Sequence, residues 1–74
     1  MKNIILTKFG KRVRLIRKAQ GLSQEDLAER ADMHRTYIGM IERGEKNITL
    51  LNIHKIANAL DITISSLTDE QNGQ

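Results

Sequence analysis

Apolar residues recur at three- and four-residue steps along most of the chain, and this spacing predicts α-helices. The first such series predicts a helix over about residues 4–19. Its apolar positions are Leu6, Phe9, Val13 and Ile16. Gly21 is expected to end this helix, because glycine readily adopts the left-handed conformation that follows many helices. No segment shows the alternation of a strand, so the pattern indicates an all-α fold.

Two short helices with a tight turn between them are predicted next, over about residues 24–31 and 35–43. Ser23 is placed to cap the first, with Asp26 at the capping-box position three residues later. Asp32 lies in the turn, where a left-handed residue is useful and aspartate adopts that conformation more readily than most residues. The inward positions of the two helices are Leu27, Ala28, Ala31, Ile38 and Ile41. Gly44 is expected to end the second.

Two further helices complete the expected fold, over about residues 50–60 and 63–68, with Thr49 and Thr63 as caps. The inward stripe of the longer one is Ile53, Ile56, Ala57 and Leu60. At 100° per residue, Leu51 falls on the opposite side from this stripe. Together with Ile64 and Leu67, it leaves apolar surface near the C-terminus, which is typical of a partner surface. We interpret these three residues as a homodimer interface; the alternative is that the last helix folds over Leu51 within one chain.

The length and composition of the chain exclude several classes of protein. Seventy-four residues are enough for one small domain, here residues 1–74, and with no cysteine a disulfide framework and a thiolate metal site are excluded. His34 and His54 have no acidic partner at ligand spacing, so no metal and no cofactor is expected. No apolar run reaches the roughly 18 residues of a membrane span, and no signal peptide is visible, so a cytoplasmic protein without membrane contact is expected. The sequence has no nucleophile–base pair or phosphate loop, so an enzyme is not expected.

The net charge of +3 is unevenly distributed. Residues 1–35 hold nine basic and four acidic side chains, whereas residues 36–74 hold three basic and five acidic ones. A basic front suggests a polyanionic partner on one side, although a solvated basic helix gives the same pattern. Most basic residues of the first helix cannot reach the same polyanion together, and Arg17 is the best placed to reach a flanking phosphate of such a partner.

The third predicted helix opens with polar residues, His34, Arg35, Thr36 and Tyr37, and only then becomes apolar. Two short helices joined by a tight turn, the second opening with such side chains, match a helix-turn-helix, whose second helix enters the DNA major groove. The stretch "LSQEDLAERADMHRTYIGMIERGEKNITLLNIHKIANAL" resembles the lambda-repressor/Cro-type helix-turn-helix domain over residues 9–67. More narrowly, "HRTYIG" followed by "IERGEKNITLLNIHKIANALDI" is similar to the controller proteins of bacterial restriction–modification systems.

The resemblance implies a five-helix DNA-binding domain and a role for individual residues. The base-reading positions are Arg35, Thr36, Tyr37 and Met40, and the phosphate-binding positions are Gln24, Arg43, Lys46 and Asn47. Two positions depart from the pattern. Asp32 stands where the family usually has glycine, and Met40 stands where controller proteins often have a second small residue after Gly39. Met40 either meets a thymine methyl or fills space over Gln24.

The function that the resemblance implies is sequence-specific regulation of transcription, by autoregulation of its own gene and timing of endonuclease expression. The implied partners are a double-stranded DNA operator and a second copy of the chain, with two dimers on tandem sites as a further arrangement and RNA polymerase in the case of an activator. A phage-type repressor or an antitoxin-type autorepressor fits the same motif. A protein-interaction module without DNA binding would lack the basic and polar residues that are present here, such as Arg35 and Lys46.

Overall fold

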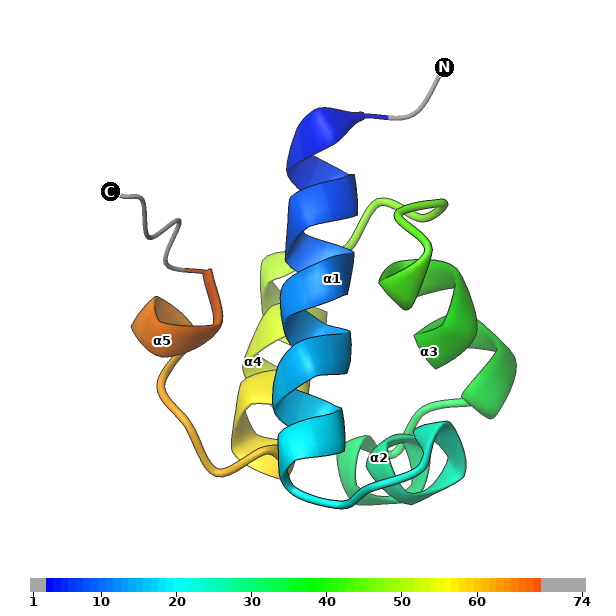
Figure 1. Ribbon diagram of the computed structural model, residues 1–74, viewed down its shortest axis with the longest axis vertical. Helices are drawn as coiled ribbons and strands as arrows, with labels where there is room; N and C mark the ends of the chain where they lie inside the picture. The colour runs from blue at the N-terminus through cyan, green and yellow to red at the C-terminus, as the bar shows by residue number, and fades with distance from the viewer. Residues whose placement is uncertain (1–2, 69–74) are drawn as a thin grey trace.

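The computed structural model describes residues 3–68, which form five α-helices (Figure 1). They are α1 (Ile4–Ala19), α2 (Gln24–Ala31), α3 (Arg35–Glu42), α4 (Leu50–Ala59) and α5 (Ile64–Thr68). These bounds agree with those expected from the sequence to within one residue. The described part of the chain contains no strand, and the predicted all-α fold is confirmed.

The ends of the helices follow local chemistry. The Ser23 side chain accepts a hydrogen bond from the Asp26 N–H, and the Asp26 carboxylate accepts one from the Ser23 N–H, which completes the predicted capping box. Asp32 has φ 57°, so it takes the left-handed conformation expected of it in the turn between α2 and α3. Gly44 ends α3 with φ 72°. An additional cap, Asn3 at the start of α1, was not anticipated from the apolar pattern.

The core lies where α1 packs against α3 and α5, with α2 and α4 closing it (Figure 1). Its large fully buried side chains come from all five helices: Val13, Leu27, Ile38, Ile41, Ile56, Leu60 and Leu67. The backbones of α1 and α3 approach closely at Gly10, where a Cβ would lie 2.3 Å from the Ile41 carbonyl oxygen. A side chain at this position would therefore force α3 away from α1.

Leu67 belongs to this core, so the expectation that it contacts a second chain is wrong. Its side chain is completely buried within one chain, because the short α5 turns this face toward α1 and α4. The Arg12 Nε donates a hydrogen bond of 2.8 Å to the Ser66 carbonyl oxygen and thereby ties α5 to α1. Leu51 is 64% exposed, so α5 does not fold over it.

Candidate nucleic-acid interface

The start of α3 is an exposed polar surface held by a local cap. His34 precedes the helix in an extended conformation, and its Nδ1 accepts a hydrogen bond of 3.1 Å from the Thr36 N–H. Arg35 and Thr36 follow in the first turn, and both side chains are exposed. Within residues 3–68 the Arg35 guanidinium has no hydrogen-bond or ion-pair partner, so all of its donors face solvent. His34 was expected among the polar residues that open this helix, and its role as the cap was not anticipated.

Tyr37 differs from its neighbours because its ring is half-buried and packs against the core. Its hydroxyl oxygen accepts a hydrogen bond of 3.0 Å from the Asn52 Nδ2, and this bond joins the beginning of α3 to the beginning of α4. The phenolic hydrogen remains free to be donated outward. Asn52 therefore orients a predicted base-reading residue, a role that no sequence pattern indicated.

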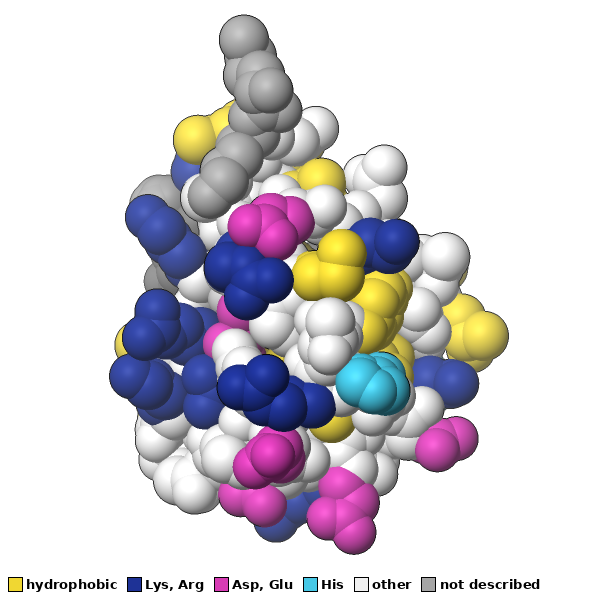
Figure 2. All heavy atoms as spheres, turned by 90° about the vertical axis from the view of Figure 1, so that its right-hand side faces the viewer, with side chains coloured by type: hydrophobic (Ala, Val, Ile, Leu, Met, Phe, Trp, Pro, Cys, Tyr) yellow, Lys and Arg dark blue, Asp and Glu magenta, His cyan; other side chains and the backbone are white. Residues whose placement is uncertain are grey.

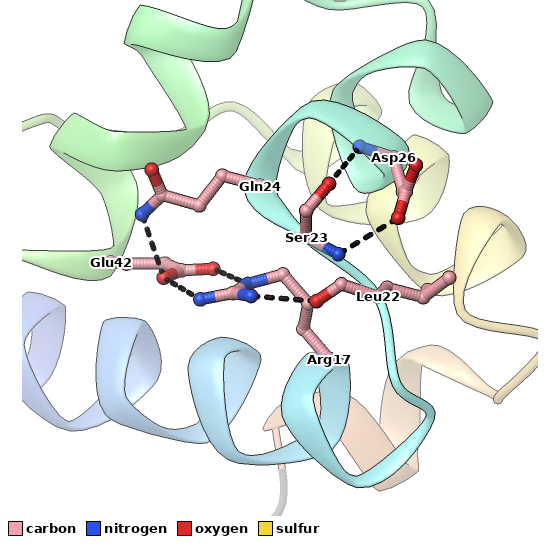
Figure 3. Close-up of polar contacts among 6 residues, drawn as sticks. All are labelled: Arg17, Leu22, Ser23, Gln24, Asp26 and Glu42. Carbon is pink, nitrogen blue, oxygen red and sulfur yellow. Dashed lines mark hydrogen bonds and ion pairs between the residues drawn. The ribbon is translucent and has the colours of Figure 1, made fainter.

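A buried ion pair holds the other end of α3 (Figure 3). The Arg17 Nε lies 2.7 Å from Glu42 Oε2, and the Arg17 Nη2 donates to Glu42 Oε1 over 3.0 Å. The remaining guanidinium nitrogen, Nη1, donates to the Leu22 carbonyl oxygen. The hydrogen bond from the guanidinium to Glu42 raises the pKa of Arg17, which keeps the guanidinium charged.

These contacts correct the prediction that Arg17 reaches a flanking phosphate. Arg17 is 7% exposed and each of its three guanidinium nitrogens donates a hydrogen bond inside the protein, so it positions α3 against α1 and the loop before α2. Glu42 was missed in the sequence. Its position next to Ile41 and one turn after Ile38, on the buried side of α3, was the available signal, because a buried carboxylate requires a partner.

The pair also fixes Gln24, the first residue of α2. Its Nε2 donates a hydrogen bond of 3.1 Å to Glu42 Oε1, so α1, α2 and α3 meet in one polar network. Every buried side-chain nitrogen and oxygen in the described residues has a hydrogen-bond partner. Such a satisfied network holds the two helices of the motif in one relative position.

The end of α3 and the loop after it carry three of the predicted phosphate-binding residues. Arg43, Lys46 and Asn47 are all exposed, and the Arg43 Nε pairs with Glu45 Oε2 at 3.1 Å. Figure 2 shows the face on which α3 lies, with Lys and Arg side chains gathered along one edge and acidic side chains mainly toward the bottom of the view. This uneven charge gives the face a positive side suited to a polyanion.

Other kinds of site find no support in residues 3–68. This part of the chain has no group of three or more His, Cys, Asp or Glu side chains placed to hold a metal ion. None of its helices combines the length and the apolar character that crossing a membrane requires. What the described residues do build is a helix-turn-helix, α2 and α3, whose second helix presents an exposed polar start.

Known proteins are similar to this chain in both fold and sequence. The family described as helix-turn-helix matches residues 13–67. Control protein C.BamHI of Bacillus amyloliquefaciens is 49% identical over 70 residues, which cover 93% of this chain and 86% of that protein. The crystal structure of the restriction–modification controller protein C.AhdI from Aeromonas hydrophila has a TM-score of 0.83 at 52% identity, with 84% of this chain and 94% of that chain covered.

A third similarity is to the restriction–modification controller protein C.Esp1396I, solved as a tetramer in complex with its natural 35 base-pair operator. It has a TM-score of 0.84 at 32% identity, and the match covers 89% of this chain and 87% of that one. The present chain therefore belongs to the helix-turn-helix family of DNA-binding regulators, in the branch of the restriction–modification controller proteins.

Proposed function

We propose that this protein binds an operator upstream of its own gene as a homodimer, regulates that gene, and times expression of a restriction endonuclease. The observation that carries the proposal is the start of α3, where Arg35 and Thr36 stand exposed on a helix whose inner face is fixed by Glu42 and Arg17. The similarity to C.BamHI and to the operator-bound C.Esp1396I supports it. This role requires no catalysis and no cofactor, and it places the protein with the DNA in the bacterial cytoplasm.

Arg35 is proposed as the principal base-reading residue. An unpaired guanidinium at the N-terminal turn of a recognition helix is suited to guanine, because it can donate two hydrogen bonds to O6 and N7. Such a contact discriminates by about 1–3 kcal/mol, which is too little to select one operator. Thr36, Tyr37 and Met40 lie on the same part of α3 and are proposed to supply further contacts.

A second copy of the chain on the same operator doubles the number of base contacts that select the DNA sequence. Leu50 and Leu51 at the start of α4 are 72% and 64% exposed, and Ile64 on the neighbouring α5 is half-buried. We propose that these apolar side chains form the homodimer interface, with the buried Leu67 supporting α5 from below. The tetramer of C.Esp1396I on its operator supports an arrangement of two dimers on tandem sites. RNA polymerase becomes a further partner if one of these dimers activates transcription.

The test is a gel-shift titration on DNA from immediately upstream of the gene, at several salt concentrations, with scrambled DNA as competitor. We expect the wild type to bind tightly and to resist the competitor. Arg35→Ala should lose at least about 30-fold in affinity for the upstream DNA and keep its affinity for scrambled DNA, because one base contact is removed from each of the two subunits. Arg14→Ala, which removes an exposed charge from α1, is the control and should retain the preference.

Equal and salt-sensitive binding of the wild type to both DNAs would contradict the proposal. It would mean that the basic residues supply phosphate attraction alone, which carries no sequence information.

A further inference from the structure

Gly39 lies in the middle of α3 and is buried, because the side chains of Arg43 and Gln24 lie next to it. A Cβ built at Gly39 would lie 3.2 Å from the Arg43 Nη1, 3.7 Å from the Gln24 Oε1 and 3.9 Å from the Gln24 Nε2. Two polar side chains from different helices therefore converge on the place where a side chain at position 39 would begin. Gly39 is not needed for its backbone conformation, since it lies inside a regular helix.

Arg43 reaches this place because of helix geometry. Residues 39 and 43 are one turn apart on the same side of a helix, and helical side chains lean toward the N-terminus. The Arg43 side chain therefore runs back over Gly39 instead of extending past the end of α3. Its Nε is paired with Glu45, and the terminal nitrogens retain donors for another acceptor.

Gln24 comes to the same place in a fixed orientation. Its Nε2 donates to the Glu42 carboxylate, which can only accept hydrogen bonds, so the amide cannot be reversed. The Oε1 consequently points away from the Glu42 carboxylate and toward Gly39, in the middle of α3 (Figure 3). The Gln24 Oε1 accepts hydrogen bonds, so it favours the Arg43 guanidinium beside it. The second hydrogen on the Gln24 Nε2 stays available to an anion.

We propose that Gly39 is a positioning residue for DNA binding. Its missing side chain lets Arg43 lie across the recognition helix beside Gln24, and the two side chains hold one DNA phosphate between them. This inference rests on the proposed function and adds to it a requirement for the smallest residue at position 39. The Arg17–Glu42 pair contributes indirectly, since it fixes Gln24.

The direct test is Gly39→Ala, compared with the wild type on the upstream duplex and on scrambled DNA. The new methyl group meets the flexible end of Arg43 and no backbone atom at short distance, so the fold is retained. Its melting temperature should stay the same or rise, because alanine favours a helix interior over glycine. Affinity for both DNAs should fall by a similar factor, about tenfold. The plot of log K against log salt should become shallower by about 1.8, because each of the two subunits loses one phosphate contact worth about 0.9.

Two further variants make the test specific. Arg43→Ala should reproduce the loss, and Gly39→Ala combined with Arg43→Ala should lose no more than Arg43→Ala alone, because both changes remove the same contact. Lys11→Ala removes a charge from the exposed side of α1 and should leave the salt dependence nearly unchanged.

Each contrary result has a distinct meaning. Unchanged binding by Gly39→Ala, or additive losses in the double variant, would overturn the inference and leave the proposed function standing. A loss confined to the upstream DNA would overturn it in favour of base reading by Arg43. Failure of the wild type to bind any DNA would overturn the proposed function and this inference together.

Discussion

Arg17 and Glu42 illustrate how single residues set the geometry of the motif. Both side chains are almost completely buried, and their two hydrogen bonds join α1 to the end of α3. Removing one partner of a buried pair leaves an uncompensated charge, which costs far more than breaking an exposed pair. Removing either Arg17 or Glu42 should therefore lower the stability of the fold, and it should weaken DNA binding only by shifting α3.

We predict that Arg17→Met lowers the free energy of unfolding by about 3–5 kcal/mol, measured by urea denaturation. Replacing both partners, as Arg17→Met with Glu42→Leu, should recover much of that loss because no charge is left buried. Lys18→Met, an exposed neighbour on α1, is the matched control and should change stability by less than about 0.5 kcal/mol. A loss of under about 1 kcal/mol for Arg17→Met would show that the pair behaves as a surface pair.

At the scale of an element, α2 depends on its first turn. The Ser23–Asp26 capping box satisfies two backbone groups that a short helix otherwise leaves unpaired. The hydrogen bond from the Ser23 N–H, with a further contribution from the Ser23 side chain, lowers the pKa of Asp26. A carboxylate whose pKa is lower in the folded state stabilises that state above its unfolded pKa. This contribution disappears as the pH falls through the folded pKa.

Asp26→Asn should therefore flatten the pH dependence of stability below about pH 4, where the wild type loses the ionised cap. The measurement is thermal unfolding between about pH 2 and pH 6 for the two proteins. Asp61→Asn is the matched control, because Asp61 is exposed and its carboxylate accepts no hydrogen bond within the described residues. An unchanged slope for Asp26→Asn would contradict the assigned role of the capping box.

At the scale of the whole molecule, most apolar residues of the described chain form one core, and the large ones that stay exposed lie on α1 (Ile4, Ile5 and Leu15) and at the start of α4 (Leu50 and Leu51). Leu67 lies in the core, whereas Leu50 and Leu51 remain on the surface. Leu15 is equally exposed, at 65%, but it lies on α1 and not on α4. This difference makes Leu15 a useful comparison for the proposed homodimer.

We predict that Leu51→Ser weakens self-association by about two to four orders of magnitude, because a two-fold interface loses two buried leucines and each contributes about 1.5–3 kcal/mol. Sedimentation equilibrium over a range of concentrations measures the effect. Leu15→Ser changes an equally exposed leucine and should dimerise like the wild type. Equal weakening by the two variants, or a wild type that stays monomeric at high concentration, would contradict the assigned interface.

Taken alone, the sequence determined the helices and their ends. Apolar spacing, the caps Ser23 and Thr49 and the left-handed Asp32 act over three or four residues, so they can be recognised without knowing what packs where. The same local reasoning identified the polar start of α3, with Arg35 exposed as the motif requires. The exposure of Leu51 also followed from helical periodicity.

Only the tertiary structure decided which residues far apart in the chain contact one another. Arg17 is one of several basic residues on α1, and its pairing with Glu42, 25 residues away, depends on how α1 docks against α3. Leu67 joined the core because α5 packs on α1 and α4. The convergence of Gln24 and Arg43 over Gly39 likewise requires two helices at a fixed separation. Local patterns do not encode these contacts, since each depends on the relative placement of elements far apart in the chain.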